Sequence, residues 1–134
     1  MVKFENNWRY KTLTNLEKDE WLNFDSDSRL IKRTKELRNI PLDDFTTEDL
    51  RIMIGQQIGL DYLIPMALET MKLDLFAEGD FFEGDLLKNV LSVRTEFWDN
   101  NKEYRDVLND LIKDSRHEIT EMKFDTSNLD NSFR

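Results

Sequence analysis

The chain has 134 residues, with 19 lysines and arginines against 28 aspartates and glutamates, for a formal net charge of −9. It has no cysteine and a single histidine, His117, which excludes disulfides and thiolate chemistry and leaves too little for a His-ligated metal site or a Ser-His-Asp triad. No apolar run approaches the roughly 18 residues of a membrane span, so we expect one soluble domain over residues 1–134.

The first ten residues contain no continuous apolar segment. Charged or amide side chains separate Phe4 from Trp8 and Tyr10, unlike the apolar centre of a secretory signal. Small secreted domains also usually contain disulfides, which this chain cannot form. We therefore expect a cytoplasmic protein with no membrane association.

Two short helices are predicted before residue 41. The first covers residues 14–24 and begins with Thr14 as its N-cap residue, because Glu17 lies three positions further on. The second covers residues 28–39, where apolar positions recur at helical spacing and basic side chains, including Arg38, occupy the solvent face.

The next helix is predicted over residues 47–56. Thr46 or Thr47 can cap it, and the carboxylates that follow lie in its first turn, where the helix dipole favours negative charge. The pair Gly55 and Gly59 then indicates a tight turn rather than a phosphate-binding loop, because no Gly-Lys-Ser/Thr sequence follows.

An apolar stripe at helical spacing covers residues 60–71, with a proline inside it. Either this helix begins near Leu63, which places Pro65 in the first turn, or it starts earlier and is kinked at Pro65. Both alternatives predict a buried helix in the middle of the chain.

Residues 72–85 contain two glycines and five carboxylates and are predicted to form a loop. Phe81 and Phe82 are expected to anchor this loop to the core. Asp85 is expected to cap the following helix.

The remaining chain predicts more helix and a frayed end. One segment begins at residue 86 and either continues or breaks before Phe97, and another covers residues 101–121. The polar tail is expected to be poorly ordered from about residue 124. Because no stretch alternates with period two, we expect an all-α fold, a compact bundle of about five to six helices.

The charge is concentrated in the middle of the chain. Residues 42–85 contain eleven acidic and two basic residues, whereas the segments before and after have net charges of only +2 and −2. Like charges at this density repel one another, so they either form a solvated face or meet a positively charged partner. Direct nucleic-acid binding is disfavoured, because phosphate recognition depends on lysine and arginine.

Two strings in this region resemble motifs of a known family. They are PLDDFTTEDLRIMIGQQIGLDYLIPMALE at residues 41–69 and GDFFEGDLL at residues 79–87. Both are similar to segments of the bacterial immunity proteins of contact-dependent growth inhibition (CDI) systems. The resemblance implies a small cytosolic helical protein that binds the C-terminal domain of a cell-surface-delivered toxin and blocks it. It identifies no catalytic residue and does not identify the toxin.

The acidic segment and the resemblance agree in one respect. Toxins that attack nucleic acid are basic, and clustered carboxylates can imitate phosphate and attract such a domain. We therefore predict a non-enzymatic, monomeric immunity protein that uses no cofactor and no metal. Its candidate partner-binding residues are Asp43, Asp44, Asp74, Glu78, Asp80 and Glu83.

Two alternatives remain open. The chain could be an acidic adaptor or regulatory protein that binds a helix of another partner. It could also be a small hydrolase that uses a carboxylate pair, with a divalent metal held by Asp80, Glu83 or Asp85. With 28 carboxylates in the chain, such pairs arise by chance at almost any spacing.

Overall fold

The computed structural model describes residues 4–19 and 28–131, which contain helices and no strand. The all-α prediction is confirmed. The helices are α1 (Leu13–Glu17), α2 (Arg29–Leu37), α3 (Thr47–Gly55), α4 (Leu60–Leu73), α5 (Asp85–Leu91), α6 (Thr95–Asn100), α7 (Lys102–Ile112), α8 (Arg116–Glu121) and α9 (Ser127–Asp130). Short 3-10 helices are η1 (Trp8–Tyr10), η2 (Leu42–Asp44) and η3 (Lys113–Ser115).

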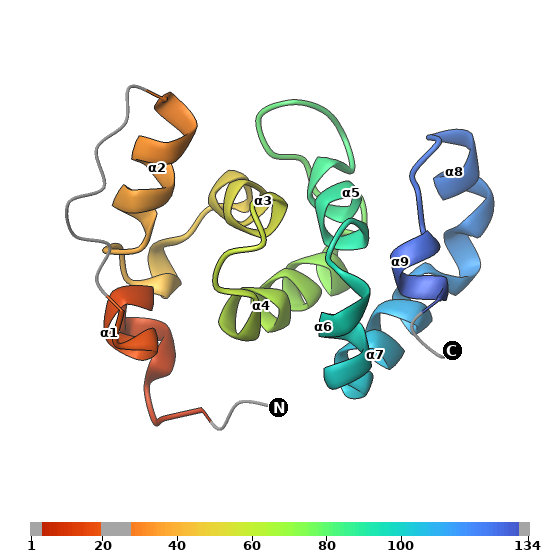
Figure 1. Cartoon of the computed structure of the whole chain (residues 1–134). Coiled ribbons are helices and arrows are strands. Elements are labelled where there is room, and N and C mark those ends of the chain that lie inside the picture. The colour runs from red at the N-terminus through yellow and green to blue at the C-terminus, as the bar shows by residue number, and fades with distance from the viewer. Residues whose placement is uncertain (1–3, 20–27, 132–134) are drawn as a thin grey trace.

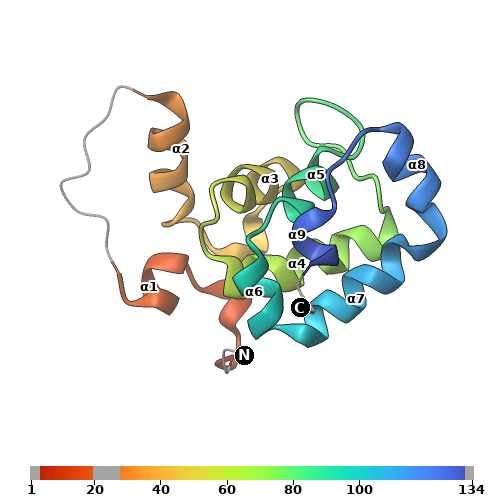
Figure 2. The same cartoon turned by 45° about the vertical axis from the view of Figure 1, so that its right-hand side comes forward.

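The helices follow one another roughly in chain order from one end of the molecule to the other (Figure 1). Helices α1 and α2 form one end, α3 and α4 the centre, and α7 and α8 the other end (Figure 2). The last short helix, α9, packs against α6. No helix within the described ranges is long and apolar enough to cross a bilayer.

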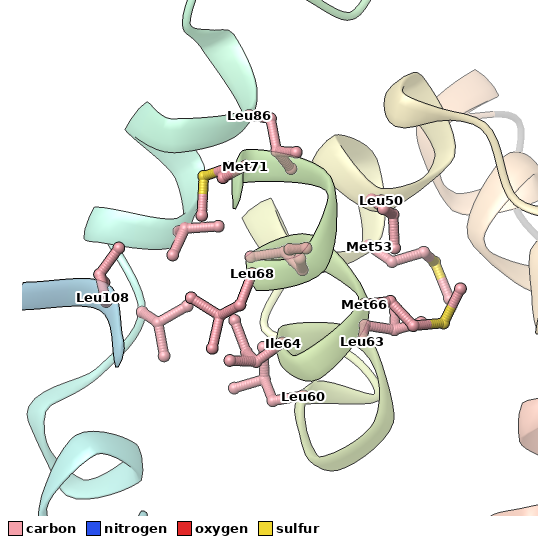
Figure 3. Close-up of a cluster of buried hydrophobic side chains, with 14 of the residues drawn as sticks. Leu50, Met53, Leu60, Leu63, Ile64, Met66, Leu68, Met71, Leu86 and Leu108 are labelled. Carbon is pink, nitrogen blue, oxygen red and sulfur yellow. The ribbon is translucent and has the colours of Figure 1, made fainter. Parts of the chain in front are cut away.

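Helix α4 is the centre of the core, because side chains on most of its sides are buried. Figure 3 shows Leu63 and Met66 on the side of α4 that faces Met53 of α3, whereas Leu68 lies on the side that faces Leu108 of α7. A helix that is apolar around most of its circumference is typical of a buried helix rather than a surface helix. The buried residues of α4 are Leu60, Tyr62, Leu63, Ile64, Met66, Ala67, Leu68 and Met71.

The first predicted helix starts earlier than expected. Its N-cap residue is Thr12 rather than Thr14, and Thr12 Oγ1 accepts a hydrogen bond from the backbone N–H of Asn15 at 3.1 Å. Starting at Leu13 places two buried leucines three residues apart on one helix face. The helix ends at Glu17, and residues 20–24 of the predicted segment lie outside the described residues.

The prediction that Arg38, at the C-terminal end of α2, lies on the solvent face is also wrong. Arg38 is only 1% exposed, and its Nη1 lies 2.5 Å from Glu17 Oε1. Its Nη2 also donates to the carbonyl oxygen of Asp19 at 2.8 Å. The helical pattern predicts that Arg38 is exposed, but its contact with the end of α1 buries it. Burial of the guanidinium is tolerated because it gains a paired charge and hydrogen-bond acceptors there.

Helix α4 starts at Leu60 and continues through Pro65, so a start near Leu63 is wrong. The earlier start is possible because Gly59, with φ of 65°, turns the chain directly into the helix. Proline has no N–H, so the carbonyl oxygen of Asp61 loses its usual helical donor.

Replacing Gly59 by alanine should destabilise the fold by about 2 kcal/mol, measured by urea denaturation. The left-handed conformation alone costs an alanine about 1–2 kcal/mol. The added Cβ would also lie 2.8 Å from Cδ1 of Leu13, which is fully buried. In a Leu13→Ala background the same change should cost less, because the steric contact is absent; an equal cost in both backgrounds would contradict the clash.

The C-terminal third contains more interruptions than the sequence pattern indicates. The segment from residue 86 breaks between α5 and α6, and the predicted helix over 101–121 is divided by η3. The six predicted helical segments thus correspond to α1 to α8. Within the polar tail, expected to be poorly ordered from about residue 124, Ser127–Asp130 form α9 and Leu129 is buried in the core, whereas residues 132–134 lie outside the described residues.

Candidate partner-binding site

The first turn of α3 begins with a capping box. The Thr46 hydroxyl accepts from the backbone N–H of Asp49 at 3.2 Å, and the Asp49 carboxylate accepts from the Thr46 N–H at 3.0 Å. This start places Glu48 and Arg51 three residues apart on one face, where two hydrogen bonds of 2.6 Å join their side chains. A fixed ion pair therefore lies at the N-terminal end of α3.

This ion pair contacts the loop between α4 and α5, residues 74–84, which we name the acidic loop. Glu48 Oε1 accepts a hydrogen bond from the backbone N–H of Asp80 at 2.8 Å. Gly79 fits closely beside it, because a Cβ at this position would lie 2.5 Å from Glu48 Oε1 and would displace that carboxylate. The acidic loop is thus held closely against α3.

A second anchor comes from Asp85, which does not have its predicted role. Gly84 occupies the N-cap position of α5, and Asp85 is the first helical residue. Its carboxylate, which is almost fully buried, points back into the acidic loop and accepts from the N–H groups of Gly79, Phe81 and Phe82 at 2.7, 3.0 and 3.3 Å. The Asp85 carboxylate therefore binds three closely spaced backbone N–H groups of the loop rather than the free N–H groups at the start of α5.

The electrostatic environment keeps both anchoring carboxylates ionised. The hydrogen bonds from Arg51 hold the pKa of Glu48 below its ordinary value. Burial alone would raise the pKa of Asp85, but the three backbone N–H donors and Arg51, whose Nε lies 3.8 Å away, lower it overall. The acidic loop therefore packs around charges that stay negative at neutral pH.

The predicted anchoring role of Phe81 and Phe82 is wrong. Phe81 is 69% exposed and Phe82 is 41% exposed. The loop is anchored on its inner side by the buried Ala77 and the partly buried Phe76, and by a backbone hydrogen bond from Gly84 to the Phe76 carbonyl oxygen at 3.0 Å. Because Asp85 holds the backbone amides inward, both aromatic rings lie on the outside.

Each exposed ring has a cationic neighbour. The guanidinium carbon of Arg51 lies 4.3 Å from the centroid of Phe81, and Lys88 Nζ lies 5.5 Å from the centroid of Phe82. The ring of Phe82 also lies 6.3 Å from that of Phe124. Phe81 is therefore positioned mainly by the ion pair beneath it.

The candidate carboxylates divide into two groups. Asp74, Glu78, Asp80 and Glu83 are all exposed on the acidic loop. Asp43 and Asp44 are also exposed but lie in η2, which packs against η1. Figures 1 and 2 show η2 and the acidic loop on different sides of α3. That all six meet one partner stays a prediction.

The sequence interpretation missed Glu48 and Arg51 as organisers of this region. A signal was present, because Arg51 is one of only two basic residues in the strongly acidic segment 42–85 and lies three residues after Glu48.

Among the described residues no group of three or more acidic or histidine side chains is arranged to hold a metal ion. The Asp85 carboxylate is occupied by backbone donors.

The family model described as CDI immunity proteins matches residues 15–108. This chain belongs to that family. The match includes the acidic loop and both of its anchors, and it confirms the resemblance carried by the two sequence motifs. Comparisons with curated proteins and with solved structures gave no match. In this CDI immunity protein, the segment after residue 108, with α8 and α9, lies outside the family match.

Proposed function

We propose that this CDI immunity protein binds the C-terminal toxin domain of its cognate effector in the cytoplasm and blocks it without any chemistry of its own. The observation that carries this proposal is the acidic loop, which presents four exposed carboxylates on a backbone held by Glu48 and Asp85. A fixed loop loses little conformational entropy on binding. Its charge attracts a basic domain, such as that of a nuclease.

Coexpression tests the function directly. The candidate toxin is the C-terminal domain of the effector that we expect to be encoded beside this gene, and it is expressed in cells with and without the immunity protein. We expect growth arrest without it and normal growth with it. Equal growth arrest in both cultures would overturn the immunity function.

Neutralising the acidic loop should slow association with the toxin domain. In a variant carrying Asp74→Asn, Glu78→Gln, Asp80→Asn and Glu83→Gln, we expect the association rate to fall at least tenfold at low salt, because electrostatic steering is lost. The difference should shrink as salt rises. The melting temperature should change little, because all four side chains are exposed. Stopped-flow binding over a salt series measures the rate.

A matched variant separates the local effect from the change in total charge. Four other exposed carboxylates on α6 and α7 can be neutralised in the same way, which changes the net charge equally but leaves the acidic loop unchanged. We expect this variant to keep most of the association rate. If association slows equally in both variants, the total charge of the protein, and not the acidic loop, sets the association rate. The control residues are Glu96, Asp99, Glu103 and Asp110.

A further inference from the structure

Two adjacent aromatic side chains on the acidic loop are exposed, Phe81 at 69% and Phe82 at 41%, although Phe82 also lies beside the ring of Phe124. Among the described residues few large apolar side chains are exposed, and Phe81 and Phe82 are neighbours in this group. Single exposed apolar residues are common on protein surfaces, but an adjacent pair on a tightly held loop is typical of an interaction site. This pair is therefore a candidate contact surface for a partner.

The ring of Phe81 is held in place before any partner arrives. It lies over the guanidinium of Arg51, which is itself fixed by the two hydrogen bonds to Glu48. The backbone N–H of Phe81 is held by Asp85 at 3.0 Å. Ring and backbone are thus positioned by separate contacts, so little side-chain entropy remains to be lost on binding.

Negative charge flanks the aromatic pair on both sides. The exposed Asp80 precedes it and the exposed Glu83 follows it. The positive charge of Arg51 is compensated by Glu48 and by the nearby Asp85. The exposed Lys88 also lies beside Phe82. The four carboxylates of the acidic loop outnumber this lysine, so the rim is mainly acidic around an apolar centre, which matches the common arrangement of an anchor within a polar ring.

We propose that Phe81 and Phe82 are the anchor residues of the toxin interface, which enter an apolar depression of the toxin domain bordered by lysine or arginine side chains. This inference rests on the proposed function and makes it specific. The carboxylates and the aromatic rings have separate roles. The carboxylates raise the association rate, whereas the rings, once buried in the interface with the toxin domain, slow dissociation.

The test uses the full chain and the purified C-terminal domain of the effector that we expect to be encoded beside its gene, made inactive by substitution. For Phe81→Ala we expect the dissociation rate to rise about 30-fold or more, as for a central anchor. The association rate and the melting temperature should stay close to those of the unchanged protein, because the ring is exposed and the charges are kept. Phe82→Ala should also speed dissociation.

Tyr10→Ala is the matched control. Tyr10 is 71% exposed, close to the 69% of Phe81. It lies outside the acidic loop, in η1, which packs against η2. Its replacement should leave both rates unchanged. If the unchanged protein does not bind the toxin domain, the proposed function fails. If it binds and Phe81→Ala dissociates no faster, or Tyr10→Ala dissociates equally fast, the anchor proposal is overturned while the proposed function stands.

Discussion

Replacing Asp85 by alanine is expected to lower the free energy of unfolding by about 3 kcal/mol and to weaken toxin binding strongly. The change leaves three backbone N–H groups of the acidic loop without their acceptor. Each hydrogen bond to a charged group contributes about 1.5–3 kcal/mol, and local opening of the loop to water limits the total loss. Urea denaturation measures the stability, and hydrogen exchange at Gly79 and Phe81 shows whether the loop opens.

Asp85→Asn is the control, because its amide oxygen can still accept part of these hydrogen bonds. It should cost less than alanine and should also change the dependence of stability on pH. The pKa of Asp85 is lowered in the folded protein from its ordinary value of 3.8, so its contribution is complete well above pH 3.8. That contribution is lost as the pH falls through 3.8 towards the lower folded-state pKa.

A stability difference between Asp85→Asn and the unchanged protein should therefore narrow in acid. If it stays constant from pH 7 to about pH 3, the ionised form of Asp85 does not stabilise the fold. If Asp85→Ala unfolds at the same urea concentration as the unchanged protein, the anchoring role of this side chain is wrong.

Replacing Trp98 by alanine is expected to cost about 3–5 kcal/mol, the range for a large core aromatic. Trp98 is fully buried in α6, with its ring 5.3 Å from that of Phe97 in an edge-to-face arrangement. Its removal leaves a cavity that the surrounding helices cannot fill completely. Urea denaturation followed by circular dichroism measures the loss.

Trp98→Phe provides a sharper comparison. The indole Nε1 is buried and has no hydrogen-bond partner among the described residues. Phenylalanine removes this unpaired donor, which offsets part of the lost packing. We expect it to cost less than half as much as alanine. Equal costs would indicate that Nε1 has an acceptor such as a buried water.

The fold class and the central helices were predictable from the amino-acid sequence. The sequence offered Thr46 or Thr47 as the N-cap of α3, and the cap is Thr46. This cap, the buried stripe of α3 and the glycine break after it depend on contacts between residues less than five positions apart, so residue spacing predicts them. The exposure of the four carboxylates on the acidic loop was predictable for a similar reason, because unpaired charges rarely become buried. The motifs at 41–69 and 79–87 also indicated the family correctly.

The construction of the candidate site depends on contacts between residues far apart in the sequence. Asp80 meets Glu48 from 32 residues away, and Arg38 meets Glu17 from 21 residues away. No local pattern encodes such pairings, because the first depends on how the acidic loop packs against α3 and the second on how the end of α2 packs against the end of α1. Once Asp85 captures the loop amides, Phe81 is turned outward, although its hydrophobicity predicts burial. The physical reason is that satisfying buried charges and backbone donors outweighs covering one aromatic ring.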